Sequence, residues 1–123
     1  MDINLKNNSS VPLYMQIYNQ VKEQILYGKL KCGDKLPSYR EFAKLYGVSI
    51  VTVTKAYDDL IKDQLITTSQ TGCFVSEKSS AIATNYHMQQ IEEKLNEIVL
   101  SAKTVEVSID EIHAILNDLW NER

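Results

Sequence analysis

Residues 36–60, LPSYREFAKLYGVSIVTVTKAYDDL, decide the fold because they encode two short helices joined at a glycine. Ser38 and Glu41 stand three positions apart, which is the spacing of a capping box at the start of the first helix. Three apolar residues of this helix then repeat at helical spacing: Phe42, Leu45 and Tyr46. Gly47 supplies the left-handed conformation that lets the chain leave the helix. The stretch therefore predicts a tight helix pair.

The second helix of the pair presents an almost uncharged first turn. Ser49 is a good N-cap, and the apolar residues after it form one stripe that we expect in the core: Val53, Ala56, Tyr57, Leu60 and Ile61. The stripe leaves an outward face made of Ile50, Val51, Thr54, Lys55 and Asp58. In a helix-turn-helix, this part of the second helix meets base edges in the major groove of DNA. Packing of Ile50 or Val51 into the core is the alternative interpretation.

The flanking sequence completes a winged helix-turn-helix. Residues 1–10 read as a flexible arm, and a helix with a clear apolar stripe begins near Pro12 and ends near Gly28. A turn-rich connection spans residues 29–35. Behind the helix pair, two β-rich runs flank the polar tip SQTG at residues 69–72, which predicts a hairpin. A hairpin in this place is a wing that lies along the DNA backbone or minor groove.

Residues 79–123 predict a tail of two amphipathic helices joined near residues 101–108. Their apolar residues step by three and four: Met88, Ile91, Leu95, Ile98, then Ile109, Ile112, Leu116 and Leu119, with Trp120 beside them. So short a tail cannot form a core of its own. It buries its apolar face against the front domain or against a second copy, and the second copy explains more because two-fold dimers are the commonest oligomers.

The expected fold class is thus α+β and mostly α, with a winged helix-turn-helix over residues 1–78 and a dimerisation tail over residues 79–123. The net charge of −3 argues at first against a nucleic-acid partner. However, residues 1–78 hold ten Lys and Arg against eight Asp and Glu, whereas residues 79–123 hold three against eight. Only the front can therefore meet phosphate, with a modest salt dependence per subunit.

Other classes of protein and site find little support. The thiols of Cys32 and Cys73 lack the spacing of a metal site or a disulfide framework, and His87 and His113 lie elsewhere in the chain. We expect no metal, no cofactor and no enzymatic activity, since the sequence carries no nucleophile elbow, phosphate loop or metal cluster. The polar N-terminus and the lack of a long apolar run indicate a cytoplasmic protein without a membrane partner.

Three segments together resemble the winged-helix domain of the GntR family of bacterial transcription regulators. They are GxLxxGDKLPSxRxxA at residues 28–43, VSxxTVxxAYxxL at 48–60 and GxFV at 72–75, and the resemblance covers roughly residues 11–75. The opening PLYxQI at residues 12–17 and the short two-helix tail are similar to the YtrA subfamily. This resemblance implies a dimeric repressor with a tail that serves for pairing and a frequent association with ABC-transporter operons. A two-fold dimer suits a palindromic operator, because operators are commonly palindromic.

The resemblance also implies DNA-contacting residues. Arg40 matches the arginine of the family's Pro-Ser-x-Arg segment, next to Ser38, while Ser49 and Thr52 match hydroxyl positions at the start of the recognition helix, with Thr54 and Lys55 one turn further. Gly72 matches a wing glycine of the family, and from the predicted hairpin tip itself we expect contacts by Gln70, Thr71 and Gly72. In the alternative interpretation, Arg40 is an ordinary surface residue that pairs with Glu41 or Asp58.

Two departures from the family pattern bear on specificity. Many relatives carry a charged or polar residue, often arginine, directly after Val-Ser, whereas this chain has Ile50-Val51, which can contact a thymine methyl but cannot donate a hydrogen bond to guanine. We therefore expect a preference for A·T-rich half-sites. Gln70 stands where the first wing glycine would be, so the wing contact is looser or uses the Gln70 amide.

The leading hypothesis is a homodimeric, sequence-specific DNA-binding repressor of its own operon. The alternative is a winged-helix module that binds another protein through the Ile50-Val51 face. Whether a small-molecule effector exists stays open, and an effector site would lie at the dimer interface or between tail and front domain. Acidic Glu92, Glu93 and Glu97 could attract a cation, but a solvated helix face explains them more simply.

Overall fold

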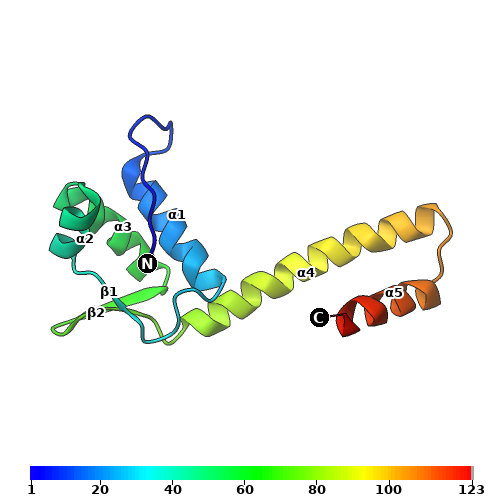
Figure 1. The fold of residues 1–123 in the computed structure, drawn as a ribbon. Coiled ribbons are helices and arrows are strands. Elements are labelled where there is room, and N and C mark those ends of the chain that lie inside the picture. Colours follow the sequence, from blue (N-terminus) through cyan, green and yellow to red (C-terminus); the bar gives the residue numbers. More distant parts are fainter. Residues whose placement is uncertain (123) are drawn as a thin grey trace. The chain divides into compact units, whose positions relative to one another are not determined.

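The computed structural model of the chain describes residues 1–122 and contains two compact units, which divide between Tyr86 and His87 inside the fourth helix. The N-terminal unit has the helices α1 (Leu13–Leu26), α2 (Tyr39–Tyr46) and α3 (Ile50–Lys62). Its strands are β1 (Lys35–Leu36), β2 (Ile66–Ser69) and β3 (Gly72–Val75), and it ends with the first turns of α4 (Ser79–Thr104). Figure 1 shows the three helices beside the small sheet. The predicted α+β, mostly helical class is confirmed.

One hydrophobic core holds this unit together. It is formed where α1 and α3 pack against each other and where the sheet closes over α3, and its members without exposed area are Ile17, Val21, Phe42, Val53, Ala56, Tyr57 and Leu60. The predicted stripe of α3 is buried at four of its positions, with Ile61 half-buried. Burial of this many apolar side chains is what fixes the helices relative to one another.

The sheet has three antiparallel strands in the order β1-β3-β2, one strand more than the predicted hairpin. In the hairpin, Ile66 pairs with Val75 and Ser69 pairs with Gly72, which leaves a two-residue tip. The missed strand β1 spans the last residue of the connection that was predicted as turn-rich and the residue after it, Leu36, which pairs with Cys73. A two-residue strand carries too little alternation to be recognised in a sequence.

The N-terminal segment contradicts the expectation of a flexible arm. Three glutamines of α1, spaced by four residues, bond to the backbone of alternate residues of this segment. The Gln16 amide pairs with both backbone groups of Lys6 (2.9 Å each), the Gln20 amide does the same with Asn4 (2.8 and 2.7 Å), and Gln24 donates to Asp2 (2.7 Å). Figure 1 shows the segment in dark blue running along α1. Every second residue of the extended segment meets every fourth residue of α1, because two extended residues and four helical residues advance along the chain by similar distances.

The apolar residues of α2 are only partly buried. Phe42 and Ala43 are the residues of this helix that enter the core, whereas Leu45 is 68% exposed. Only a narrow side of this eight-residue helix faces α3, so spacing alone could not identify which of its apolar residues are buried. Leu45 adds an apolar side chain to the surface of the helix pair.

The C-terminal unit begins at His87 and contains the rest of α4 and the helix α5 (Ile109–Asn121). Both helices and their joint near residues 101–108 agree with the sequence-based prediction. Within the described part of α4 and α5, Ser79 is the single buried residue, and it belongs to the N-terminal unit. The tail therefore has no core of its own in a single chain, as its length predicted.

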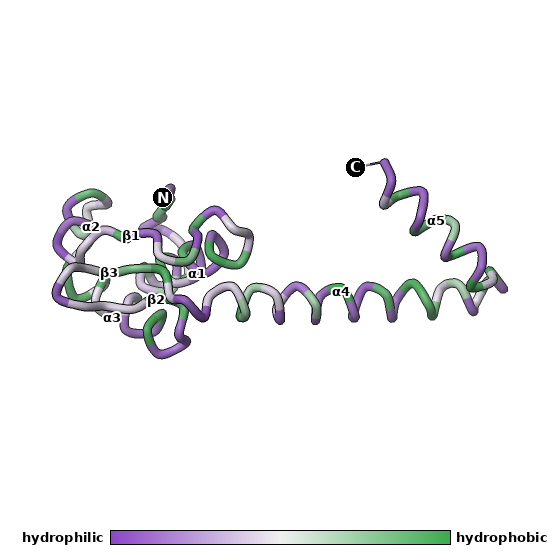
Figure 2. The backbone as a smooth tube through the Cα atoms, turned by 90° about the horizontal axis from the view of Figure 1, so that it is seen from below, coloured by the Kyte–Doolittle hydropathy of each residue, from purple (hydrophilic) through white to green (hydrophobic). Residues whose placement is uncertain are grey.

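Figure 2 shows hydrophobic and hydrophilic residues alternating along α4 with the spacing of an amphipathic helix. Among residues 1–122, no helix combines the length with the apolar character that crossing a bilayer requires.

Candidate nucleic-acid interface

A complete capping box begins α2. The Glu41 N–H donates to Ser38 Oγ and the Ser38 N–H donates to the Glu41 carboxylate, both at 3.1 Å. These hydrogen bonds hold the pKa of the Glu41 carboxyl below its usual range, so the cap is intact at neutral pH. Arg40, in the same turn, is exposed. The cap thus fixes the backbone from which the Arg40 side chain extends.

Tyr57 fixes the geometry between α2 and α3. Its fully buried ring meets Tyr39 and Phe42 edge-on, with ring centroids 5.1 and 5.9 Å away. Its hydroxyl donates to the Pro37 carbonyl at 2.8 Å, just before α2 begins. Burial raises the pKa of Tyr57, which keeps this hydroxyl a donor. The turn itself closes at Gly47, whose φ of 64° lies in the left-handed region that the sequence predicted.

The start of α3 is capped and apolar. Ser49 Oγ accepts the Thr52 N–H at 3.1 Å and lies 2.9 Å from the Thr52 hydroxyl, so both hydroxyls take part in the cap. Ile50 is 43% exposed and Val51 78% exposed, which excludes the interpretation of these two as core residues. An open groove of about 410 Å³ runs along this face, and its lining is Ile50, Val51, Thr54, Lys55, Asp58 and Asp59.

Charge divides this groove along the helix. Its first turn is uncharged and its second turn carries Lys55, whose ammonium lies 3.9 Å from the centroid of the Tyr14 ring. The third turn carries Asp58 and Asp59. A polyanion can approach the first two turns without repulsion, whereas the third turn repels it.

The tip of the hairpin is small and polar. Gln70 and Thr71 are exposed, and the Ser69 and Thr71 hydroxyls lie 2.9 Å apart. Gly72 has a φ of 135°, where a residue with a side chain is strained, and the Lys35 side chain lies beside it. The tip can therefore approach another backbone closely.

Comparison with known proteins agrees with this geometry. The model of "Bacterial regulatory proteins, gntR family" matches residues 13–75, which is the helix-turn-helix with its sheet. The chain belongs to the gntR family. Over 118 residues it is 34% identical to the HTH-type transcriptional repressor YtrA of Bacillus subtilis, covering 95% of this chain and 91% of that protein.

Solved structures of this family extend the comparison. YtrA from Sulfolobus acidocaldarius, a GntR-family transcription factor, superimposes with a TM-score of 0.58 at 34% identity, covering 72% of this chain and 97% of that one. The DNA-binding domain of AraR in complex with operator ORX1 superimposes with a TM-score of 0.54 at 29% identity, covering 62% of this chain and 96% of that one. The resemblance to the GntR family and its YtrA-like members, stated from the sequence, is thereby confirmed.

The structure brings part of the expected GntR site together. Ile50, Val51, Thr54 and Lys55 line one groove, and Arg40 and the wing residues Gln70 and Thr71 are exposed. Ser38, Ser49 and Thr52 instead hydrogen-bond within their own caps. The contact between Tyr14 of α1 and Lys55 of α3 was not predicted from the sequence. The helical spacing of the aromatic residues in α1 does not indicate which of them contacts a side chain of another helix.

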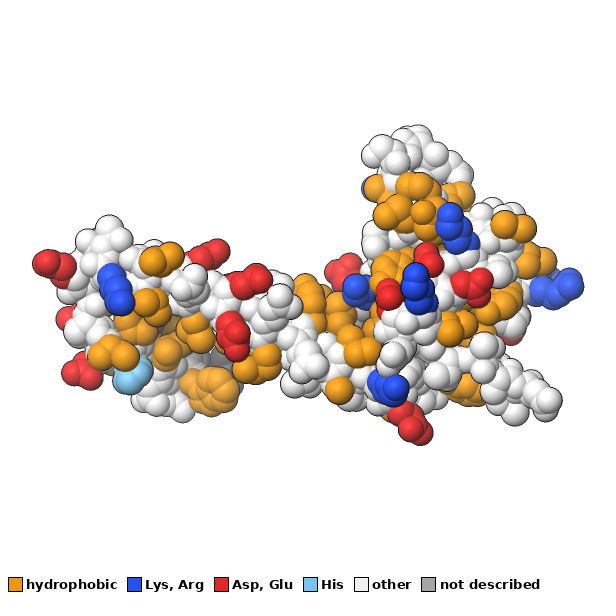
Figure 3. Space-filling view, turned by 180° about the vertical axis from the view of Figure 1, so that it is seen from behind, with side chains coloured by type: hydrophobic (Ala, Val, Ile, Leu, Met, Phe, Trp, Pro, Cys, Tyr) orange, Lys and Arg blue, Asp and Glu red, His pale blue; other side chains and the backbone are white. Residues whose placement is uncertain are grey.

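The predicted dimerisation residues of the tail are exposed in the single chain, with Ile112 half-buried and Trp120 84% exposed. Figure 3 shows hydrophobic side chains gathered on the surface of the C-terminal unit, with acidic side chains around them. A groove of about 440 Å³ lies between α4 and α5 within this unit, with Ile98, Ala102, Ile112 and Ile115 among its lining. A lone tail would leave this apolar surface in water.

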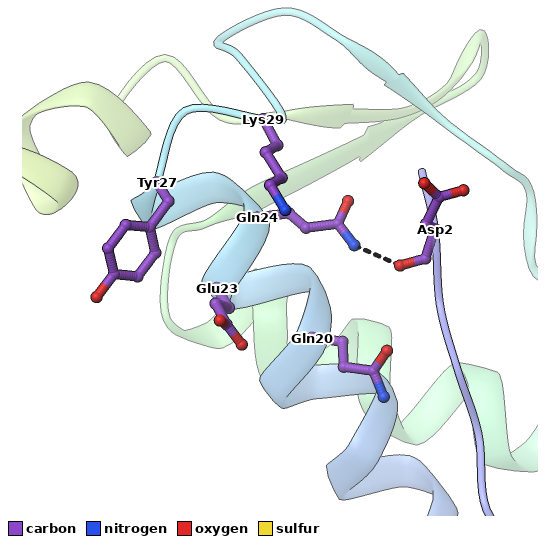
Figure 4. A pocket seen from close by; sticks show the side chains of 6 residues that line it. All are labelled: Asp2, Gln20, Glu23, Gln24, Tyr27 and Lys29. Carbon is purple, nitrogen blue, oxygen red and sulfur yellow. Dashed lines mark hydrogen bonds between the residues drawn. The ribbon is translucent and has the colours of Figure 1, made fainter.

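Other candidate sites are weaker. A hollow of about 420 Å³ lies between the N-terminal segment and α1, where Gln24 donates to the Asp2 carbonyl (Figure 4). Its lining is polar and includes no residue of α2 or α3. Within residues 1–122, no group of three His, Cys, Asp or Glu is placed to hold a metal, and the thiols of Cys32 and Cys73 are free.

Proposed function

We propose that this GntR-family chain binds double-stranded DNA as a homodimer and represses transcription from the promoter of its own operon. The observation that carries the proposal is the capped α2–α3 pair, which exposes an uncharged first turn of α3 in the same unit as a hairpin with an exposed polar tip. An α-helix with such a turn fits the major groove, where it meets base edges without bringing negative charge to the phosphates.

Each part of the surface suits a different contact. Ile50 and Val51 offer methyl groups to thymine, which favours A·T-rich half-sites. Arg40, from the capped start of α2, suits a phosphate or a guanine edge. Lys55 and Thr54 follow one turn along the groove, and the wing tip at Gln70, Thr71 and Gly72 lies on the backbone or minor groove. Ser38, Ser49 and Thr52 assist by fixing the two helix N-termini, whose N–H groups attract phosphate.

The relatives support the same function. The B. subtilis protein named above is a transcriptional repressor by its name, and it is similar to this chain along nearly its whole length. The superimposed AraR domain is bound to an operator. Because the proposed dimer is two-fold symmetric, its operator is a palindrome with half-sites related by the same axis.

Binding to upstream DNA tests this function. We expect the full chain to bind a labelled duplex from upstream of its own gene at least about 1,000-fold more tightly than scrambled DNA. Fluorescence anisotropy at moderate salt measures both affinities. Arg40→Ala should weaken binding, whereas Lys103→Ala, in the tail, should not. Equal affinity for both duplexes would refute sequence-specific DNA binding.

A protein partner at the same face is the second candidate, favoured by exposed Leu45, Ile50 and Val51 and by the low basic charge of the domain. The salt dependence of the binding constant separates the two functions. DNA binding releases counterions and weakens steeply with salt, whereas an apolar protein interface does not.

Removing the negative charge of Asp58 should strengthen DNA binding. Asp58 lines the protein groove along α3, one turn beyond Lys55, where its carboxylate repels the nearest DNA phosphates. We expect Asp58→Asn to raise affinity about three- to tenfold at low salt, with a smaller gain at high salt. Glu92→Gln, an equal charge change in the tail, is the matched control. An unchanged affinity in Asp58→Asn would place the phosphates away from the third turn of α3.

A further inference from the structure

The contact between Lys55 and Tyr14 joins α3, the helix proposed to enter the major groove, to α1 at the surface. Tyr14 lies in the first turn of α1, half-buried against the core, and Lys55 lies exposed in the second turn of α3. The Lys55 ammonium is 3.9 Å from the centroid of the Tyr14 ring, well within the range of a cation–π interaction. Core packing does not require this contact, because the lysine is exposed.

A ring and a carboxylate hold an ammonium group with different consequences. A carboxylate neutralises the charge, whereas the face of an aromatic ring restricts the side chain and leaves the charge available to an anion. Two carboxylates are within reach of Lys55 along its own helix. Asp58 and Asp59 follow it by three and four residues, the spacings at which side chains on a helix meet.

We infer that Tyr14 is a positioning residue for DNA binding, which holds the charged Lys55 ammonium at the groove and away from Asp58 and Asp59. This inference rests on the proposed function, because the anion that the ammonium meets is a phosphate of the DNA backbone. The ring restricts the flexible lysine before DNA arrives, so less side-chain entropy is lost on binding.

A double-mutant cycle on the full chain tests the inference. With the upstream duplex as probe, Tyr14→Leu and Lys55→Ala should each weaken binding by about three- to tenfold, and the double variant should be no weaker than Lys55→Ala alone. Tyr14→Leu should also lower the slope of log affinity against log salt by up to about one, although it leaves the lysine in place. Tyr14→Phe keeps the ring and should bind like the unsubstituted chain.

A further variant separates positioning from packing. Pentafluorophenylalanine in place of Tyr14 keeps the bulk of the ring and reverses its quadrupole, so it should preserve the melting temperature and still weaken DNA binding as Tyr14→Leu does. Unchanged DNA affinity in this variant would overturn the inference, as would a Tyr14→Leu effect that persists in full when Lys55 is already alanine. Equal binding of upstream and scrambled DNA by the unsubstituted chain would refute the proposed function, and the inference with it.

Discussion

Gln16→Ala should destabilise the N-terminal unit by about 2–3 kcal/mol, because three hydrogen bonds disappear from one largely buried side chain. Gln16 is only 9% exposed, and its amide bonds to both backbone groups of Lys6 and to the Val11 carbonyl, at 2.8–2.9 Å. Alanine leaves these three backbone groups without that partner and removes packing volume. For a unit of this size, such a loss lowers the melting temperature by roughly 10 °C or more.

The glutamines of α1 provide a graded control for this prediction. Gln20 makes two exposed hydrogen bonds to Asn4, and Gln24 makes one to Asp2. Gln20→Ala should cost about 1 kcal/mol and Gln24→Ala less than that, because water replaces exposed hydrogen bonds readily. Thermal unfolding followed by circular dichroism, at one protein concentration for all three variants, measures the series. Melting temperatures equal to that of the unsubstituted chain in all three variants would show that these hydrogen bonds to the N-terminal segment contribute nothing to stability.

The helix boundaries of the DNA-binding unit were readable from the sequence because local interactions determine them. Ser38 with Glu41, Ser49, and Gly47 each act within a few residues, and each occupies the predicted capping position. The buried face of α3 could be predicted for the same reason, because its apolar residues recur at helical spacing. The exposure of Ile50 and Val51 was left open by the sequence, because an apolar residue in a first turn suits either a core or a partner.

Interactions between residues distant in the chain were not readable. The glutamine series at 16, 20 and 24 has the period of a helix, but nothing local indicates that its partner is residues 2–6. The conformation at the end of α3 could not be predicted from the sequence either. Gln64 adopts a left-handed conformation with a φ of 63°, a place where glycine is usual, and the Tyr18 hydroxyl from α1 donates to the neighbouring Asp63. Tertiary contacts override the local preference at such positions.

Leu95→Asp should convert the proposed dimer into monomers and weaken DNA binding by about 100-fold or more, because an unpaired carboxylate would enter an apolar interface twice. Leu95 lies in the middle of the α4 stripe between Ile91 and Ile98, and all three are exposed in the single chain. A monomer binds one half-site only, so it loses the gain in effective concentration that links the second half-site to the first.

Gln89→Asp is the matched control for Leu95→Asp, since it adds the same charge to α4 on the side away from the stripe. Molar mass from light scattering should report a dimer for the unsubstituted chain and Gln89→Asp, and a monomer for Leu95→Asp. A dimeric Leu95→Asp would place the interface elsewhere on the chain. A monomeric unsubstituted chain that still binds a palindrome cooperatively would mean that DNA itself brings two copies together. Affinities measured across protein concentration separate these cases, because a preformed dimer falls apart on dilution while assembly on DNA steepens the binding curve.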